Sequence, residues 1–245
     1  MNGTFSAPVS ENWTEHRNPS DSDDIIARVP DSAPDIVDAA VTAAANARKA
    51  WRAVPGPTRA EHLHRWAATI VGRSEELAQM ISREVGKPIA EARGEVARAG
   101  VILRYYAGEA VRQIGEVIPA QTPGALQFTL RDPLGVVALI TPWNFPLAIP
   151  LWKAAPALAF GNTVVLKPSE MASSVATLLA ETAVGAGLPP GVFNIVLGRG
   201  ATVGARLLSS DAVRGISFTG SSAVGKTVAA VGAARNIRYQ TEMGG

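Results

Sequence analysis

Five short segments combine polar or glycine-rich chemistry with a position directly after a β-rich apolar run. These segments are residues 141–146, 167–170, 198–204, 219–225 and 242–245. Amides of glycine turns that open a helix can bind phosphate, and an acidic residue near a strand end can accept hydrogen bonds from ribose hydroxyls. The five segments together predict a site for a nucleotide-like ligand at one edge of a sheet.

Glu170 follows the second of these apolar runs, where nucleotide-binding sheets commonly place an acidic residue. Lys167 beside it can donate to the same sugar or to a phosphate. A solvated surface ion pair between Lys167 and Glu170 explains the same two residues equally well. Position alone leaves both interpretations open.

A competing motif occupies residues 220–227, which match the pattern G-x-x-x-x-G-K-[ST] between a strand and a helix. Taken alone, the motif predicts a nucleoside triphosphatase, with Lys226 on the β- and γ-phosphates and Thr227 on magnesium. Only 18 residues follow Thr227 in the 245-residue chain, and none of them forms a strand ending in a metal-binding aspartate. The triphosphatase therefore remains the less favoured alternative.

The elements that must position these segments alternate between strands and helices from residue 134 onward. The expected strands cover residues 135–140, 163–167, 193–197, 215–219 and 237–241, and the expected helices lie near 147–160, 171–186, 201–209 and 222–234. Apolar strands that alternate with helices are typical of a parallel sheet covered on both faces. The sequence therefore predicts an α/β protein with a doubly wound, five-stranded nucleotide-binding sheet over residues 134–245.

The first 115 residues are expected to pack on this cofactor-binding sheet. Residues 1–31 predict an extended polar arm, and Ser32 with Asp35 predicts a capped helix start. Apolar spacing then predicts further helices over residues 58–85 and 89–114. Residues 116–133 predict a hairpin, because short strands at 116–120 and 128–131 flank a turn-rich segment.

Composition excludes several classes of protein. Hydrophobic residues make up 47% and charged residues 18% of the chain, which excludes general disorder. The formal net charge is only +2, so no nucleic-acid-binding surface is expected. The absence of cysteine excludes disulfides and thiolate metal sites, and no metal site is predicted.

The first 24 residues lack a signal-peptide pattern, so a cytoplasmic protein is expected. Residues 134–166 are apolar, but four prolines and Lys153 argue against a membrane span.

Several of these segments, taken together, resemble the aldehyde dehydrogenase superfamily in their order and spacing. The motifs are ITPWNFP at 140–146, VLKPSE at 165–170, FTGS at 218–221 and TEMGG at 241–245, with supporting matches at 156–162 and 188–194. The resemblance extends from about Asn18 to the last residue. It also explains residues 220–227 as the family's glycine-serine turn, with Lys226 and Thr227 as incidental variation.

The resemblance implies an NAD(P)-dependent oxidoreductase with a dinucleotide bound at the strand ends. The residues that match the family's cofactor-binding positions are Ile140, Thr141, Pro142, Trp143, Asn144, Lys167, Ser169, Glu170, Gly200, Gly204, Phe218, Thr219, Gly220, Ser221, Val224, Glu242, Met243 and Gly244. In the family, Glu170 next to Lys167 favours NAD, with NADP as the alternative. The 116–133 hairpin resembles the arm through which these enzymes form homo-oligomers.

The resemblance also implies two catalytic roles. In the family, a cysteine thiolate attacks an aldehyde, hydride passes to the nicotinamide, and water hydrolyses the thioester to the carboxylic acid. Asn144 matches the donor to the oxyanion, and Glu242 matches the base that activates water. On position alone, Asn144 could instead make a turn between two prolines, and Glu242 could cap a strand. A place just past a buried strand would desolvate Glu242, which suits a base.

The departure from the family is the missing nucleophile, which lies further along the chain in a catalytic domain. Because this sequence has no cysteine, we expect a truncated portion of the enzyme that cannot itself oxidise an aldehyde, or a non-catalytic cofactor-binding fragment. Residues 105–110 and 238–245 resemble the branch that acts on small semialdehydes, including 2,5-dioxovalerate. The expected small-molecule partner of the complete enzyme is therefore an aldehyde or semialdehyde, with no nucleic acid or membrane partner.

Overall fold

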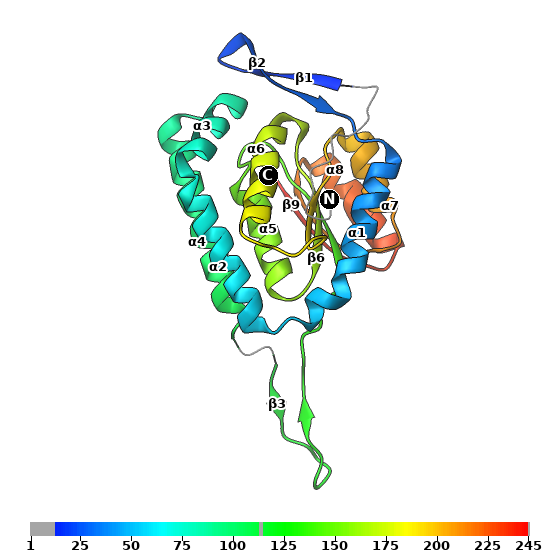
Figure 1. The fold of residues 1–245 in the computed structure, drawn as a ribbon. Helices are drawn as coiled ribbons and strands as arrows, with labels where there is room; N and C mark the ends of the chain where they lie inside the picture. The colour runs from blue at the N-terminus through cyan, green and yellow to red at the C-terminus, as the bar shows by residue number, and fades with distance from the viewer. Residues whose placement is uncertain (1–12, 113–114, 245) are drawn as a thin grey trace.

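The computed structural model describes residues 13–112 and 115–244, and its centre is a five-stranded parallel sheet (Figure 1). The spatial order is β7-β6-β5-β8-β9. The strands are β5 (Val136–Ile140), β6 (Thr163–Lys167), β7 (Phe193–Ile195), β8 (Val213–Gly220) and β9 (Arg238–Met243). This arrangement confirms the predicted α/β class and the doubly wound sheet.

The central strands are apolar throughout because each of them is buried on both faces. On β5, Val137 and Leu139 join one hydrophobic cluster, whereas Val136 and Ala138 join the other. Since successive side chains of a strand point to opposite faces, a continuous apolar run satisfies both clusters at once. The sequence signal for β5 and β6 is therefore a direct consequence of helices on both sides.

Helices cover both faces of the sheet, in two layers on one face and in a single layer on the other. On one face lie α5 (Ala148–Ala159) and α6 (Ser173–Gly185), and the other face carries α1 (Pro34–Ala53), α7 (Ala205–Ser209) and α8 (Ser222–Ala234). Outside α5 and α6, a further layer is formed by α2 (Gly56–Gly72), α3 (Ser74–Val85) and α4 (Ile89–Glu109), visible at the left of Figure 1.

Hydrogen bonds as well as apolar contacts join this outer layer and α1 to α5 and α6. The Trp51 indole N–H donates to the Leu158 carbonyl at 3.1 Å, and the Trp66 indole N–H donates to the Thr182 hydroxyl at 2.8 Å. Both indoles are fully buried. Each tryptophan thus contributes a large apolar surface while its polar atom stays paired.

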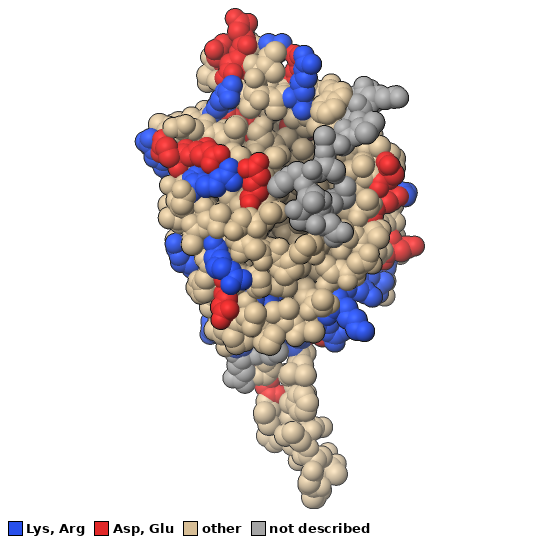
Figure 2. All heavy atoms as spheres, in the orientation of Figure 1, with Lys and Arg blue, Asp and Glu red and all other residues tan. Residues whose placement is uncertain are grey.

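Two antiparallel hairpins extend from this body. The first pairs β1 (Trp13–Asn18) with β2 (Asp21–Pro30), so the expected extended arm is a hairpin in its described part; residues 1–12 lie outside the described residues. The second pairs β3 (Val117–Ile118) with β4 (Gln127–Phe128) and projects away from the body (Figure 1). Figure 2 shows this projecting arm to be almost free of charged side chains.

Three helix predictions need correction. The first helix begins at Pro34 rather than behind a Ser32 cap, because the preset φ of proline suits the first turn, and no side chain caps it. The predicted 58–85 helix is two helices that meet at Arg73, whose side chain binds Glu76 and Glu181. The predicted 89–114 helix ends at Glu109, and residues 113 and 114 lie outside the described residues.

Within the described ranges, no helix combines the length and apolarity needed to cross a membrane. The apolar stretch at 134–166 contains strand β5, a loop, helix α5 and most of strand β6, as the sequence predicts. Its apolarity is explained by burial within the protein.

Candidate functional site

The carboxyl ends of the sheet strands lie in one row. In the register of the parallel strands, Ile140 on β5 is opposite both Lys167 on β6 and Phe218 on β8, and Phe218 is opposite Thr241 on β9. Chain order reverses between β5 and β8, which makes this the topological switch point of the sheet. Doubly wound sheets bind their ligands in the crevice outside such a point.

A cleft of about 500 Å³ opens at this edge of the sheet. Three of the predicted segments converge on it, and all of its lining residues belong to the set expected from the sequence. They are Pro142, Trp143, Asn144, Thr219, Gly220, Ser221, Glu242, Met243 and Gly244. The sheet therefore brings the first of these segments next to two others that follow it by about 75 and 100 residues in the chain.

The remaining predicted residues are not part of the lining of this cleft. Ile140 and Phe218 belong to the strand ends, Thr141 follows β5, and Val224 is exposed in the first turn of α8. Gly200 and Gly204 bound a short π-helical turn before α7. Among the described residues, the buried hydroxyl of Thr141 has no hydrogen-bond partner.

The β6 exit contains the Lys167–Glu170 pair. The Lys167 ammonium lies 3.1 Å from a Glu170 carboxylate oxygen, and the two side chains are 4% and 46% exposed. Ser169 between them accepts a hydrogen bond from the Met171 amide at 3.3 Å. The ion pair exists, but only its carboxylate half is solvated, so Lys167 is not the ordinary surface lysine of the alternative interpretation.

Glu242 is placed differently from the sequence expectation. It lies within β9 rather than past its end, and β9 is an edge strand with mostly exposed side chains, Glu242 included. The expected burial of this carboxylate is therefore absent, because an edge strand has a neighbour on one side only. Hydrogen bonds instead orient Glu242: Gln240 donates to one carboxylate oxygen at 3.0 Å and Thr219 to the other at 3.2 Å.

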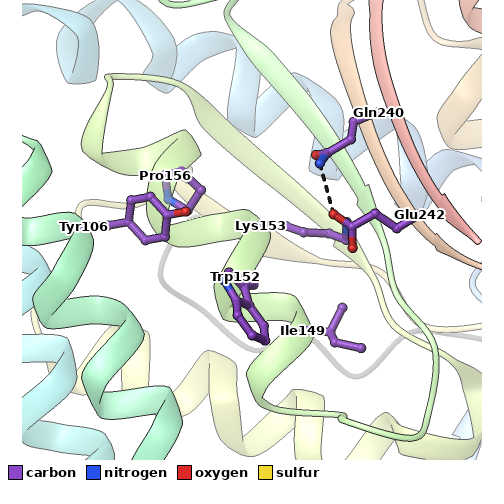
Figure 3. Close-up of a pocket in the computed structure, with 7 residues that line it drawn as sticks. All are labelled: Tyr106, Ile149, Trp152, Lys153, Pro156, Gln240 and Glu242. Carbon is purple, nitrogen blue, oxygen red and sulfur yellow. Dashed lines mark hydrogen bonds between the residues drawn. The ribbon is translucent and has the colours of Figure 1, made fainter.

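A second cavity of about 520 Å³ shares Glu242 with the cleft and lies between β9, α4 and α5 (Figure 3). Lys153 points into it from α5, and its ammonium donates to the Ser217 hydroxyl at 2.9 Å. Ser217 in turn donates to Gln240 at 3.1 Å. Burial lowers the pKa of Lys153, and attraction to Glu242 partly offsets that effect. Lys153 is not among the site residues predicted from the sequence, although a single cation in an apolar helix is a signal that could have identified it.

Buried glutamates occupy two of the helix N-termini near the site. Glu95 on α4 accepts hydrogen bonds from the Leu147 and Ala148 amides at the start of α5, at 2.9 and 3.0 Å. Glu84 on α3 does the same for Ser174 and Val175 at the start of α6, at 2.7 and 2.8 Å. Negative charge at a helix N-terminus is favourable, so both ends are already satisfied by the protein itself.

The start of α8 has no such carboxylate among the described residues. Ser221 is the N-cap and accepts a long hydrogen bond of 3.4 Å from the Val224 amide. Gly225 lets the helix approach the strand ends, since a Cβ there would stand 2.3 Å from the Met243 sulfur and 3.3 Å from the Phe218 ring. A Cβ on Gly220 would stand closer still to the Phe218 ring, at 2.6 Å.

The same helix argues against the triphosphatase alternative. A phosphate-cradling loop needs its glycines before the helix begins, with the lysine and hydroxyl residue opening the helix. Here α8 begins at Ser222, so Gly225, Lys226 and Thr227 are helical, and the Thr227 hydroxyl donates to the Ala223 carbonyl at 3.4 Å.

The turn of Gly200 and Gly204 is fixed by the chain preceding α1. Asp31 accepts hydrogen bonds from the Arg199 amide and the Arg199 guanidinium, both at 2.9 Å, and from the Thr202 hydroxyl at 3.0 Å. Burial opposes the ionisation of Asp31, but these bonds outweigh it and hold its pKa below the usual range. No local pattern in the sequence indicates this long-range contact.

A doubly wound sheet with a cleft at its switch point is the architecture of dinucleotide-binding α/β proteins. The sequence model of the aldehyde dehydrogenase family matches residues 5–245 of this chain. The chain therefore belongs to the aldehyde dehydrogenase family. Within the described residues, no group of three or more His, Asp or Glu side chains is placed to hold a metal ion.

Individual relatives agree with this assignment. An alpha-ketoglutaric semialdehyde dehydrogenase of Bacillus subtilis is 46% identical over 245 residues, which are 100% of this chain and 50% of the relative. A 2,5-dioxopentanoate dehydrogenase of Saccharolobus solfataricus is 39% identical over 230 residues, covering 93% of this chain and 48% of the relative. The chain thus spans about half the length of these relatives.

Solved structures give the same result for the fold. An aldehyde dehydrogenase of Brucella melitensis biovar abortus superposes with a TM-score of 0.97 at 39% identity, covering 100% of this chain and 50% of that one. The structure of PnpE in complex with nicotinamide adenine dinucleotide superposes with a TM-score of 0.95 at 39% identity, with the same coverage.

Proposed function

We propose that this chain is the dinucleotide-binding portion of an NAD(P)-dependent aldehyde dehydrogenase that oxidises a short semialdehyde to the dicarboxylic acid. The observation that carries the proposal is the 500 Å³ cleft, which residues 142–144, 219–221 and 242–244 line together at the switch point of the sheet. Similar proteins include an alpha-ketoglutaric semialdehyde dehydrogenase, a succinate-semialdehyde dehydrogenase and a glutarate-semialdehyde dehydrogenase, which supports the substrate class.

The pyrophosphate of the dinucleotide would bind at the start of α8. A helix N-terminus attracts phosphate through its free amides and its dipole. Glu95 and Glu84 already fill this role at α5 and α6. By elimination, Ser221 and the amides after it provide the remaining helix end that borders the cleft. The close approach allowed by Gly220 and Gly225 shapes that end of the cleft.

The ribose of the adenosine would bind at Lys167 and Glu170. The exposed Glu170 carboxylate can accept hydrogen bonds from both hydroxyls of an unmodified ribose. A 2′-phosphate would meet the same carboxylate and be repelled. We therefore expect NAD to bind more tightly than NADP.

Asn144 and Glu242, which both line the cleft, would act on the reacting carbon. The bound cofactor supplies a nicotinamide ring that accepts a hydride. Among the described residues the Asn144 carboxamide has no hydrogen-bond partner and is exposed, so it is free to donate to a developing oxyanion. Gln240 and Thr219 fix the orientation of the Glu242 carboxylate, which would accept a proton from water.

The chain alone should not turn over an aldehyde, because it has no cysteine to form the covalent adduct. The projecting arm at 116–133 would contribute to a homo-oligomer, since its apolar side chains, such as Phe128 and Leu126, are 54% and 72% exposed.

Calorimetric titration of the chain with NAD⁺, NADP⁺ and Mg-ATP tests the proposal. We expect saturable NAD⁺ binding, weaker NADP⁺ binding and no ATP hydrolysis. Glu170→Gln should lower the ratio of the NADP⁺ dissociation constant to the NAD⁺ dissociation constant about fivefold to tenfold, a change of ~1 kcal/mol in the relative binding free energy. Absence of dinucleotide binding, or ATP hydrolysis that Lys226→Ala abolishes, would refute the proposal.

A further inference from the structure

A buried ion pair lies directly beneath the loop that carries Asn144. Lys87 follows Gly86, the residue that caps the C-terminus of α3 with a left-handed φ of 71°. Glu95 lies on α4. The two side chains are 11% and 0% exposed, and the Lys87 ammonium donates to a carboxylate oxygen of Glu95. A buried pair of charges persists when further hydrogen bonds satisfy both partners.

Those further contacts all reach the loop between β5 and α5. The Lys87 ammonium donates to the backbone carbonyl of Asn144 at 2.8 Å and stands 3.9 Å from the centre of the Phe145 ring. The second oxygen of Glu95 accepts from the Leu147 and Ala148 amides. One ion pair therefore contacts four of the five residues from Asn144 to Ala148, while the Asn144 side chain stays free of it.

We propose that Lys87 and Glu95 form a positioning pair that fixes Asn144 for oxyanion stabilisation; the inference rests on the proposed role of Asn144. A hydrogen-bond donor stabilises a developing charge only if it is held in place before the charge forms. The bond from Lys87 to the Asn144 carbonyl immobilises the peptide group of that residue.

Nitrogen-15 relaxation in the full chain measures this at the Phe145 amide, which shares a peptide group with the Asn144 carbonyl, and at the Asn144 amide on the other side of the same Cα. Lys87→Met removes the anchor, Lys87→Arg preserves charge and donors, and Lys87→Met with Glu95→Gln removes the charge pair but keeps an acceptor for Leu147 and Ala148. Lys49→Met is the control, because Lys49 is exposed and makes no hydrogen bond or ion pair with the described residues.

The Asn144 order parameter should fall from about 0.85 to below about 0.6 in Lys87→Met and in the double variant. Lys87→Arg and Lys49→Met should keep the wild-type value. The double variant retains the cap of α5, so its loss of order cannot come from fraying of that helix. If Lys87→Met alone fails to fold, the double variant and Lys87→Arg decide the question. An unchanged order parameter in the folded double variant would overturn the proposal.

Dinucleotide affinity provides a second readout. Because residues 142–144 line the cleft, the double variant should bind NAD⁺ about fivefold more weakly than the wild type. Lys87→Arg should keep most of the wild-type affinity. Equal affinity in all variants would overturn the positioning role. A wild-type chain that binds no dinucleotide would instead refute the proposed function, and the relaxation measurement, which needs no cofactor, would still judge the ion pair.

Discussion

Replacing Gly225 with alanine separates the stability of the fold from the shape of the cleft. The new Cβ would stand 2.3 Å from the Met243 sulfur. Since nonbonded heavy atoms rest about 3.5–4.0 Å apart, the sulfur must withdraw by about 1.2–1.7 Å. Met243 lines the cleft and its flexible side chain is 44% exposed, so it can move at low cost. Alanine also favours a helix over glycine by about 0.5–1 kcal/mol.

We therefore expect Gly225→Ala to change the free energy of unfolding by no more than about 1 kcal/mol, and to weaken NAD⁺ binding about tenfold, or ~1.4 kcal/mol. Urea denaturation and calorimetry measure the two quantities. Gly94→Ala is the matched control: Gly94 is also helical, a Cβ there meets no atom within 4 Å, and only stability should rise. Unchanged NAD⁺ affinity in Gly225→Ala would refute the placement of the dinucleotide against Met243.

Three further predictions concern the scaffold. Glu84→Ala should lower the free energy of unfolding by about 3 kcal/mol, because two amides of α6 lose a charged acceptor, while Glu91→Ala on the exposed face of α4 should change it little. Asp31→Asn should destabilise the chain at pH 7, and its difference from wild type should shrink as the pH falls below 3.8, since the pKa of folded Asp31 is lowered. Phe128→Ser with Leu130→Ser, both exposed on the arm, should reduce the mass of any assembly measured by light scattering.

Each of these predictions has an opposing result. Equal urea midpoints for Glu84→Ala and Glu91→Ala would show that the α6 cap is dispensable. A stability difference for Asp31→Asn that is constant down to pH 3 would exclude the ionised carboxylate as its source. An assembly of unchanged mass would remove the arm from the oligomer interface.

The elements that the sequence predicted best are those with a local signal. Strands β5 and β6 were predicted to within one residue, because burial on both faces demands an unbroken apolar run. Strand β9 shows the limit of that signal: it extends through Glu242 and Met243, and it is largely exposed because it forms the edge of the sheet. Whether a strand lies at an edge depends on strand order, which no short segment encodes.

The candidate site divides in the same way. Its lining residues lie at or just past the carboxyl ends of strands, so the position of each motif relative to its strand predicted that they share one cleft. The supporting carboxylates Glu84, Glu95 and Asp31 act on segments that are 52 to 168 residues distant in sequence. For Glu84 and Glu95, the only local indication of a supporting role is a glutamate on the apolar face of a helix, and that pattern does not identify the segment it binds.

The two buried indoles have a consequence for how the molecule must fold. Their acceptors lie 107 and 116 residues further along the chain, so the helices that carry Trp51 and Trp66 finish synthesis long before their partners exist. Contacts of such sequence separation form late and make folding slow. The emission of these tryptophans should therefore report docking of the whole helical layer onto the sheet, rather than formation of the helices themselves.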